Sequence, residues 1–178
     1  RDARRALGRK DKRFSFEVFD CAKIPHKGCN FDLVIANHVL FYCEDIPAVC
    51  NEIQRVLVPG GKLICSTYGS HHMQEVSQLV QDFDNRIVLS ADRLYERFGR
   101  ENGADILAPY FSDISWESYN DSLLVPDAEP LISYILSCHG NQNQYLLDKY
   151  TDFRGFVSRK TKDGFFITKD AGIFLCEK

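Results

Sequence analysis

The sequence lacks several features that would place it outside ordinary globular proteins. No apolar stretch approaches the roughly 20 residues of a membrane-spanning helix, so we exclude a membrane protein. The first 13 residues are strongly charged, which argues against a secretory signal peptide in this segment. The seven cysteines occur singly, with no Cys-x-x-Cys pair, and this argues against disulfides and structural zinc. We therefore expect reduced thiols and a cytoplasmic protein.

The chain also lacks a Gly-x-Gly-x-x-Gly loop, the pattern that lets a backbone approach a phosphate or carboxylate. Gly60 and Gly61 follow a predicted helix instead of opening one, so they form no such cradle. The chain begins with Arg1, and its single methionine is the internal Met73. We expect either a processed protein or the tail of a longer polypeptide.

Charge is distributed unevenly along the chain. The first 13 residues hold seven cations and two aspartates, a net +5, whereas the whole chain carries −3, so the remainder carries −8. A basic arm can contact nucleic acid, but the acidic body opposes a phosphate-binding surface. We therefore do not expect a nucleic-acid partner. Hydrophobic content of 44% over 178 residues is sufficient for a domain with its own core.

The most informative segment runs from Phe31 to Gly69. Residues 32–36 (DLVIA) form a short apolar run, typical of a strand covered on both faces. From Ile46 the apolar residues recur at helical spacing, and Pro59-Gly60-Gly61 is predicted to stop that helix. Residues 62–67 (KLICST) follow as a second strand. The pattern predicts a β-α-β unit with parallel strands and a right-handed crossover.

The same residues carry a resemblance. FDLVIANHVLFY followed by EIQRVLVPGGKLICSTYG resembles the fourth-strand to fifth-strand region of class I S-adenosylmethionine-dependent methyltransferases. The second half of the chain is similar to bacterial small-molecule methyltransferases of the type-11 sort. The resemblance implies an α/β, Rossmann-like sheet with strand order 3-2-1-4-5-7-6, N-terminally incomplete in this chain. S-adenosylmethionine, or S-adenosylhomocysteine after transfer, is the implied cofactor.

Within that pattern, residues 1–10 (RDARRALGRK) resemble the end of a helix and residues 14–18 (FSFEV) the third strand. If strands 1 and 2 of the family's sheet are absent, strand 4, which corresponds to residues 32–36 here, would expose an unpaired apolar edge. Such an edge favours association. A partner chain in a homodimer, a strand exchange or a rearranged sheet would cover that edge.

Five residues match the family's cofactor positions. Asp20 maps to the carboxylate that accepts from the adenine amine, and Cys21 to the residue that offers its backbone N–H. Asn37, His38 and Val39 follow the first apolar strand, where open α/β sheets place their ligands. Each also has a purely structural interpretation: Asp20 as a loop-opening residue and His38 as a turn residue.

Few residues have the pattern of catalytic or metal-binding groups. His38 is a candidate general base, because an imidazole titrates near neutrality. Phe41 and Tyr42 either wall the pocket or pack on the next helix. His71 and His72 are adjacent and point apart on a helix or strand, so they cannot chelate one ion together. We therefore assign no metal site.

From Ser70 onward the sequence predicts mainly helices within one domain of residues 1–178. Residues 70–112 are expected to form a helical lid over the acceptor, in which Ser90 is the N-cap of a helix. The candidate aromatic residues of the lid are Tyr68, Tyr95, Phe98, Tyr110 and Phe111. Residues 114–124 read as a strand, 126–137 as a helix and 142–160 as one longer helix. Residues 164–168 with 172–176 read as a closing hairpin or one bulged strand.

The implied function is methyl transfer from S-adenosylmethionine to a small-molecule acceptor by proximity and in-line orientation. The alternative is a degenerate, non-catalytic methyltransferase-like module for binding or assembly, which the missing glycine loop favours. No Ser-His-Asp or Cys-His motif supports a third kind of chemistry.

Overall fold

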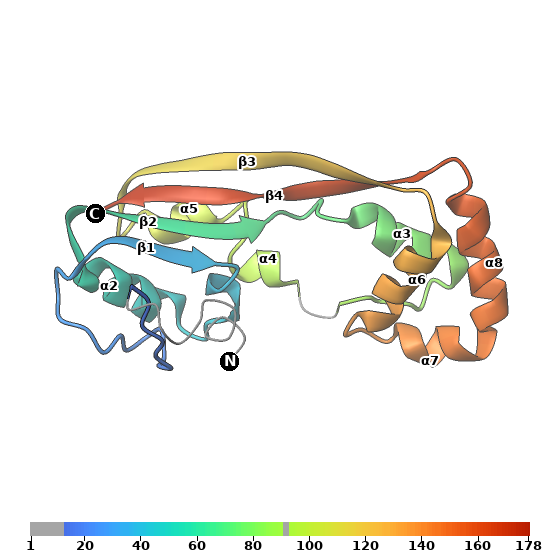
Figure 1. The fold of residues 1–178 in the computed structure, drawn as a ribbon, viewed down its shortest axis with the longest axis horizontal. Helices are drawn as coiled ribbons and strands as arrows, with labels where there is room; N and C mark the ends of the chain where they lie inside the picture. The colour runs from blue at the N-terminus through green and yellow to red at the C-terminus, as the bar shows by residue number, and fades with distance from the viewer. Residues whose placement is uncertain (1–12, 91–92) are drawn as a thin grey trace.

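The computed structural model describes residues 13–90 and 93–178 and divides them into two lobes joined by a long β-ribbon (Figure 1). The helix expected over residues 1–10 lies outside the described residues. In chain order the elements are β1 (Phe31–Asn37), η1 (Leu40–Tyr42), α2 (Ile46–Val56), β2 (Leu57–Tyr68), α3 (Gln74–Phe83), α4 (Leu94–Arg97), α5 (Gly103–Leu107), β3 (Ser112–Val125), α6 (Ala128–Ser137), α7 (Gln142–Leu146), η2 (Leu147–Lys149), α8 (Tyr150–Lys160) and β4 (Phe165–Glu177).

The four strands form one mixed sheet in the order β1-β2-β4-β3. β1 and β2 are parallel, and β4 is antiparallel to both of its neighbours, β2 and β3. This order and polarity correspond to strands 4-5-7-6 of the predicted sheet. The Rossmann-like fold class predicted from the sequence is confirmed.

The β1-α2-β2 unit forms where its sequence pattern indicates. The Asp45 carboxylate caps α2 by accepting from the Ala48 N–H at 2.9 Å, and a proline occupies the first turn. The apolar residues of α2 at helical spacing are buried against the sheet. However, α2 ends at Val56, and β2 already begins at Leu57. Pro59-Gly60-Gly61 therefore lies within the start of β2, and its prediction as the helix stop was wrong.

Two predictions at the edge of the sheet were also wrong: a strand over residues 14–18, and burial of both faces of β1. Residues 14–18 are irregular, because no neighbouring strand among the described residues supplies ladder hydrogen bonds to them. β1 is not covered on both faces: Leu33 is 46% and Ile35 64% exposed. Within the described residues β1 pairs only with β2, so it is the unpaired apolar edge expected for an incomplete sheet.

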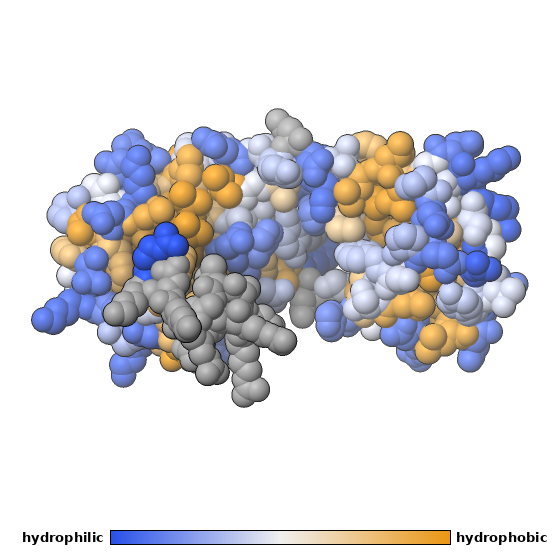
Figure 2. All heavy atoms as spheres, in the orientation of Figure 1, coloured by the Kyte–Doolittle hydropathy of each residue, from blue (hydrophilic) through white to orange (hydrophobic). Residues whose placement is uncertain are grey.

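The sheet lobe consists of the sheet's body with α2, α4 and α5, and the helical lobe consists of α3 and α6–α8. Each has its own hydrophobic core. β4 contributes to both, with Phe174 buried in the sheet lobe and Ile167 in the helical lobe. Figure 2 shows hydrophobic side chains gathered over each lobe and more hydrophilic ones between them.

Several predictions for the second half of the chain are corrected. α4 begins after Arg93, not at a Ser90 cap. Residues 142–160 form α7, η2 and α8 instead of one helix. β3 and α6 match their predicted segments, and β4 is one continuous strand. α3 belongs to the helical lobe, whereas α4 and α5 pack on the sheet lobe.

Among the described residues, no helix combines the length and apolarity that crossing a bilayer requires.

Candidate active site

The carboxyl ends of β1 and β2 are tied together by one serine. Ser66 Oγ on β2 accepts from the His38 N–H at 2.9 Å and donates to Asn37 Oδ1 at 2.5 Å. His38 adopts a left-handed backbone with φ of 50°, which turns the chain out of β1. Asn37 and His38 are exposed, and Val39 is half-buried. The structure thus presents these three predicted residues at the sheet's carboxyl edge.

The second predicted segment, Asp20-Cys21, forms a tight turn before β1. Asp20 Oδ1 accepts from the Ala22 N–H at 2.9 Å, and the Asp20 carbonyl accepts from the Lys23 N–H at 2.8 Å. Asp20 itself is exposed. Asp20 therefore acts as a loop-opening residue, the purely structural interpretation considered from the sequence. The turn leaves its carboxylate accessible to a ligand.

Cys43 brings this turn close to the residues that follow β1. Its thiol donates to the Val39 carbonyl at 3.6 Å. Burial, followed by the neighbouring Cys21 thiol, raises the pKa of Cys43. Because Cys21 and Val39 both adjoin Cys43, the two predicted cofactor segments lie side by side, although about 16 residues separate them in sequence.

Glu52 and Arg55 of α2 hold the 20–26 loop in place, and sequence reasoning missed both. Glu52 Oε2 accepts from the Ile24 N–H at 2.8 Å. The Arg55 guanidinium donates to the carbonyls of Ile24 at 2.9 Å and His26 at 2.8 Å. The two side chains also hydrogen-bond each other at 2.7 Å. No local pattern signals these contacts, since they join segments about 30 residues apart.

These contacts predict a defined acid sensitivity. Hydrogen bonding to Arg55 is the main cause that lowers the pKa of Glu52 from its ordinary 4.5 to about 2. Because the folded-state pKa is depressed, Glu52 stabilises the fold above pH 4.5 and loses this contribution as the pH falls from 4.5 to about 2. We expect the free energy of unfolding to fall more steeply across that window in the wild type than in Glu52→Gln. Urea titrations across the window measure it, with the exposed Glu44→Gln as control. Equal slopes in wild type and Glu52→Gln would contradict the assignment.

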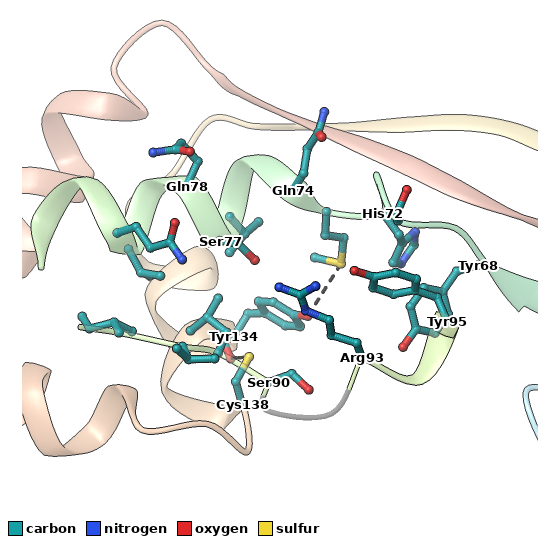
Figure 3. A pocket seen from close by; sticks show the side chains of 18 of the residues that line it. Tyr68, His72, Gln74, Ser77, Gln78, Ser90, Arg93, Tyr95, Tyr134 and Cys138 are labelled. Atoms are coloured by element: carbon teal, nitrogen blue, oxygen red, sulfur yellow. Dashed lines mark hydrogen bonds between the residues drawn. The ribbon is translucent and has the colours of Figure 1, made fainter. Parts of the chain in front are cut away.

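A cavity of about 560 Å³ lies between the two lobes, next to the carboxyl end of β2 (Figure 3). Tyr68, the last residue of β2, lines this cavity and connects it to the predicted cofactor edge, the name used here for residues 37–39 together with the 20–23 turn. The ring centroid of Tyr68 lies 6.5 Å from that of His38 and 5.6 Å from that of Phe41. Tyr95 packs against Tyr68 at 6.3 Å. Tyr134 enters from α6 on the opposite side.

The predicted lid aromatics therefore divide into two groups. Tyr68 and Tyr95 line the cavity, whereas Phe98 and Phe111 are buried in the sheet-lobe core with Tyr110 packed against it. Phe41 is buried at 2% exposure, and Tyr42 is 66% exposed. The helical-lobe side of the cavity could not be predicted, because it depends on how two distant segments pack together.

His72 lines the same cavity as a half-buried residue, and sequence reasoning left its role unassigned. Its ring lies 5.2 Å from that of Tyr68, and its Nδ1 is buried with no hydrogen-bond partner among the described residues. Burial, followed by the charge of Lys169, lowers the pKa of His72, so the ring is neutral at pH 7. Burial likewise raises the pKa of Tyr68, which keeps its phenol protonated.

His71 does not pair with His72, but the structure brings it near two carboxylates. Single ligand atoms of His71, Glu101 and Asp170 all lie within 4.8 Å of one another. Asp170 already binds Arg100 at 2.8 Å, and Glu101 Oε1 accepts from the Ser70 N–H at 2.9 Å. The guanidinium supplies positive charge to this cluster, and we assign no metal to it.

The described residues fit one side of the implied cofactor. The exposed Asp20 carboxylate can accept from an adenine amine, and the neighbouring turn and residues 37–39 form one continuous edge. For the methionyl end the chain offers no glycine-rich loop. The fit is therefore to the adenine and ribose side of S-adenosylmethionine.

Comparison with known proteins points to the same family. The family model described as a methyltransferase domain matches residues 1–65. A malonyl-acyl-carrier-protein O-methyltransferase of Methylovorus sp. is 31% identical over 71 residues, 40% of this chain and 24% of that protein. The sterol 4-C-methyltransferase strm-1 of Caenorhabditis elegans is 47% identical over 45 residues, 25% and 14% of the two chains.

The fold agrees with these sequence matches. A solved protein of Bacillus halodurans assigned as a methyltransferase superposes with a TM-score of 0.53 at 12% identity, covering 90% of this chain and 69% of that one. The chain spans a quarter or less of the curated relatives above. The matched sequence segment, the strand order and this fold all resemble those of class I S-adenosylmethionine-dependent methyltransferases.

Proposed function

We propose that the protein transfers a methyl group from S-adenosylmethionine to a small molecule held in the cavity between the lobes. The observation that carries this proposal is the position of Tyr68. Its ring contacts His38 at the cofactor edge and also lines the cavity, so a donor at that edge and an acceptor in the cavity would be neighbours.

The chain's own residues supply binding and orientation in this reaction. Asp20, the Cys21 backbone and residues 37–39 hold the cofactor, which when bound supplies an electrophilic methyl group. The acceptor is oriented by the aromatic and polar residues of the cavity. Methyl transfer depends mainly on close, in-line placement of the two partners. His38 is the candidate base, because it is exposed at the edge beside Tyr68.

The relatives leave the acceptor open. One is named for methylating malonyl-acyl-carrier protein and the other for methylating a sterol at carbon. Sequence similarity to methyltransferases with such different acceptors supports methyl transfer as the common activity. The acceptor must therefore be inferred from the cavity of this chain.

The second candidate function is a non-catalytic binding or assembly module. The absence of a Gly-x-Gly-x-x-Gly loop favours it, because that loop approaches the cofactor's methionyl end in the family. Isothermal titration of S-adenosylhomocysteine into this chain separates the two functions. We expect saturable one-to-one binding that S-adenosylmethionine displaces. Absence of binding at about 1 mM ligand, a weak-affinity limit near −4 kcal/mol, would favour the module over the enzyme.

For the sheet edge we propose a homodimer, in which β1 pairs with β1 of a second copy or exchanges with it. The support is the unpaired ladder of β1 with Leu33 and Ile35 exposed. We expect Ile35→Lys to weaken self-association by at least about tenfold, since a charge on an edge strand opposes pairing. Sedimentation equilibrium measures this. Leu147→Lys, at a 60% exposed position in η2, is the control. A wild type that remains monomeric at about 100 μM, a concentration at which a specific dimer should form, would contradict the dimer.

We also propose a cytoplasmic location. The support is that Cys21, Cys29, Cys43, Cys50, Cys65, Cys138 and Cys176 are all free thiols. Free cysteines of this number persist in reducing compartments. Alkylation of freshly lysed cells before purification tests this, with seven modified thiols as the expected result.

A further inference from the structure

The cavity between the lobes has an unusual charge balance. Among the described residues that line it, none is aspartate or glutamate, and Arg93 is the one permanently charged side chain. His72 adds no second charge, because its burial keeps the ring neutral at pH 7. The body of the protein is acidic overall, so a described lining that holds an arginine and no carboxylate is not a consequence of the average composition.

Arg93 has further guanidinium N–H groups that can donate to a ligand. One guanidinium nitrogen binds Glu96 at 3.1 Å, in a pair whose side chains are 68% and 56% exposed. Such exposed pairs contribute little stability and exchange readily. A guanidinium carries five N–H groups and binds oxyanions in a bidentate manner. Figure 3 shows the Arg93 side chain between Tyr134 of α6 and the Tyr68–Tyr95 pair.

One wall of the cavity is apolar and firmly held. Its aliphatic residues come from α3 and from the segment before α4: Val76, Val80, Ile87, Val88 and Leu89. The Val88 backbone is fixed to Asn141, with its N–H donating to Asn141 Oδ1 at 2.7 Å and its carbonyl accepting from the Asn141 N–H at 3.0 Å. A rigid aliphatic wall favours an apolar carbon body.

The facing wall offers neutral hydrogen-bonding groups. Tyr68, His72 and Tyr95 lie there, near the carboxyl end of β2 (Figure 3). The buried Nδ1 of His72 has no hydrogen-bond partner among the described residues, so this ring nitrogen can hydrogen-bond to a ligand. The cavity volume of about 560 Å³ falls in the range of small-molecule sites.

We propose that this cavity takes an acceptor with an anionic oxygen group, held by Arg93, and an apolar carbon body, held by α3 and residues 87–89. The inference rests on the proposed function and narrows it, since it names the chemical class of the acceptor. Amines and other cations are disfavoured by the same arginine. A carboxylate and a phosphate ester both satisfy this chemistry.

Matched eight-carbon probes test the proposal without any cofactor. Isothermal titration compares octanoate, octyl phosphate, octanamide and octylammonium on the intact chain. We expect at least one of the two anions to bind 10-fold or more tighter than octanamide, because a charge-assisted hydrogen bond is stronger than one between neutral groups. Acetate, which lacks the carbon body, should bind at least about 100-fold more weakly than octanoate. Which anion binds tighter distinguishes the carboxylate from the phosphate ester.

Two variants and one control assign the selectivity to Arg93. Arg93→Gln should abolish the preference for anions, and Arg93→Lys should restore part of it. Arg97→Gln is the matched control, because Arg97 ends the short helix α4 that Arg93 precedes, donates to the Cys43 carbonyl at 2.7 Å and does not line the cavity. Equal binding of octanoate and octanamide, tighter binding of octylammonium, no binding of any probe, or selectivity that survives Arg93→Gln would each overturn the inference.

The same samples separate this inference from the proposed function. S-adenosylhomocysteine is titrated into the wild type and into Arg93→Gln. Cofactor binding without anion selectivity overturns the acceptor class alone. Anion selectivity without cofactor binding supports the anion-binding cavity and overturns methyl transfer. Cofactor affinity should be the same in both proteins, because Arg93 lines the acceptor cavity and not the cofactor edge.

Discussion

Replacing Phe174 with alanine should lower the free energy of unfolding by about 3–5 kcal/mol, the usual cost of removing a large buried aromatic ring. Phe174 is 1% exposed on β4, the strand between β2 and β3. Its ring lies 4.7 Å from that of Trp116 and 5.9 Å from that of Phe98. A Cβ added at Gly103 would come within 2.3 Å of it, so α5 packs directly on this ring.

Urea unfolding followed by Trp116 fluorescence measures this change, because the chain has a single tryptophan and it contacts Phe174. Phe166→Ala is the matched control on the same strand, where the side chain is 54% exposed. We expect a loss below about 1 kcal/mol there, as for most exposed substitutions. Similar losses in the two variants would mean that β4 does not organise the sheet lobe as described.

Removing the Asp20 carboxylate should weaken S-adenosylhomocysteine binding by about 10- to 100-fold, the effect of losing one hydrogen bond to a charged group. Asp20 is exposed beside the cofactor edge, and its Oδ1 also accepts from the Ala22 N–H. The substitution therefore has a local structural effect as well as a binding effect, and two variants separate them.

Asp20→Asn keeps a side-chain oxygen for the Ala22 N–H but removes the charge, whereas Asp20→Ala removes both. We expect the alanine variant to lose the most affinity and the asparagine variant to lie between it and the wild type. Asp148→Asn, in η2 of the helical lobe, is the control and should bind as the wild type does. Unchanged affinity in Asp20→Ala would show that Asp20 is only a loop-opening residue, which is the structural interpretation of its turn.

The β1-α2-β2 unit could be predicted because its signals are local. The helical spacing from Ile46 and the apolar run of residues 32–36 both lie within one short segment. The end of α2 was less predictable: Leu57 already adopts extended backbone, with ψ of 142°, before the proline is reached. Helix ends depend on the strand that follows as much as on breaker residues.

The rest of the site could not be predicted because it depends on tertiary packing. Residues 14–18 have a strand pattern, but a strand needs a neighbour, and none among the described residues pairs with them. The bridge by Ser66 and the anchoring of Ile24 by Glu52 join segments about 28 residues apart. The cavity is further removed from local sequence, since Tyr68 and Tyr134 face it from different lobes.

The central claim is that the carboxyl edge of β1 and β2, with the 20–23 turn, binds the cofactor. Hydrogen–deuterium exchange with and without S-adenosylhomocysteine tests it most directly, because the backbone itself reports where the ligand lies. We predict slower exchange in residues 20–23 and 37–43, and little change in α7 and α8. Unchanged exchange at both segments under saturating ligand, or protection confined to the helical lobe, would contradict the account.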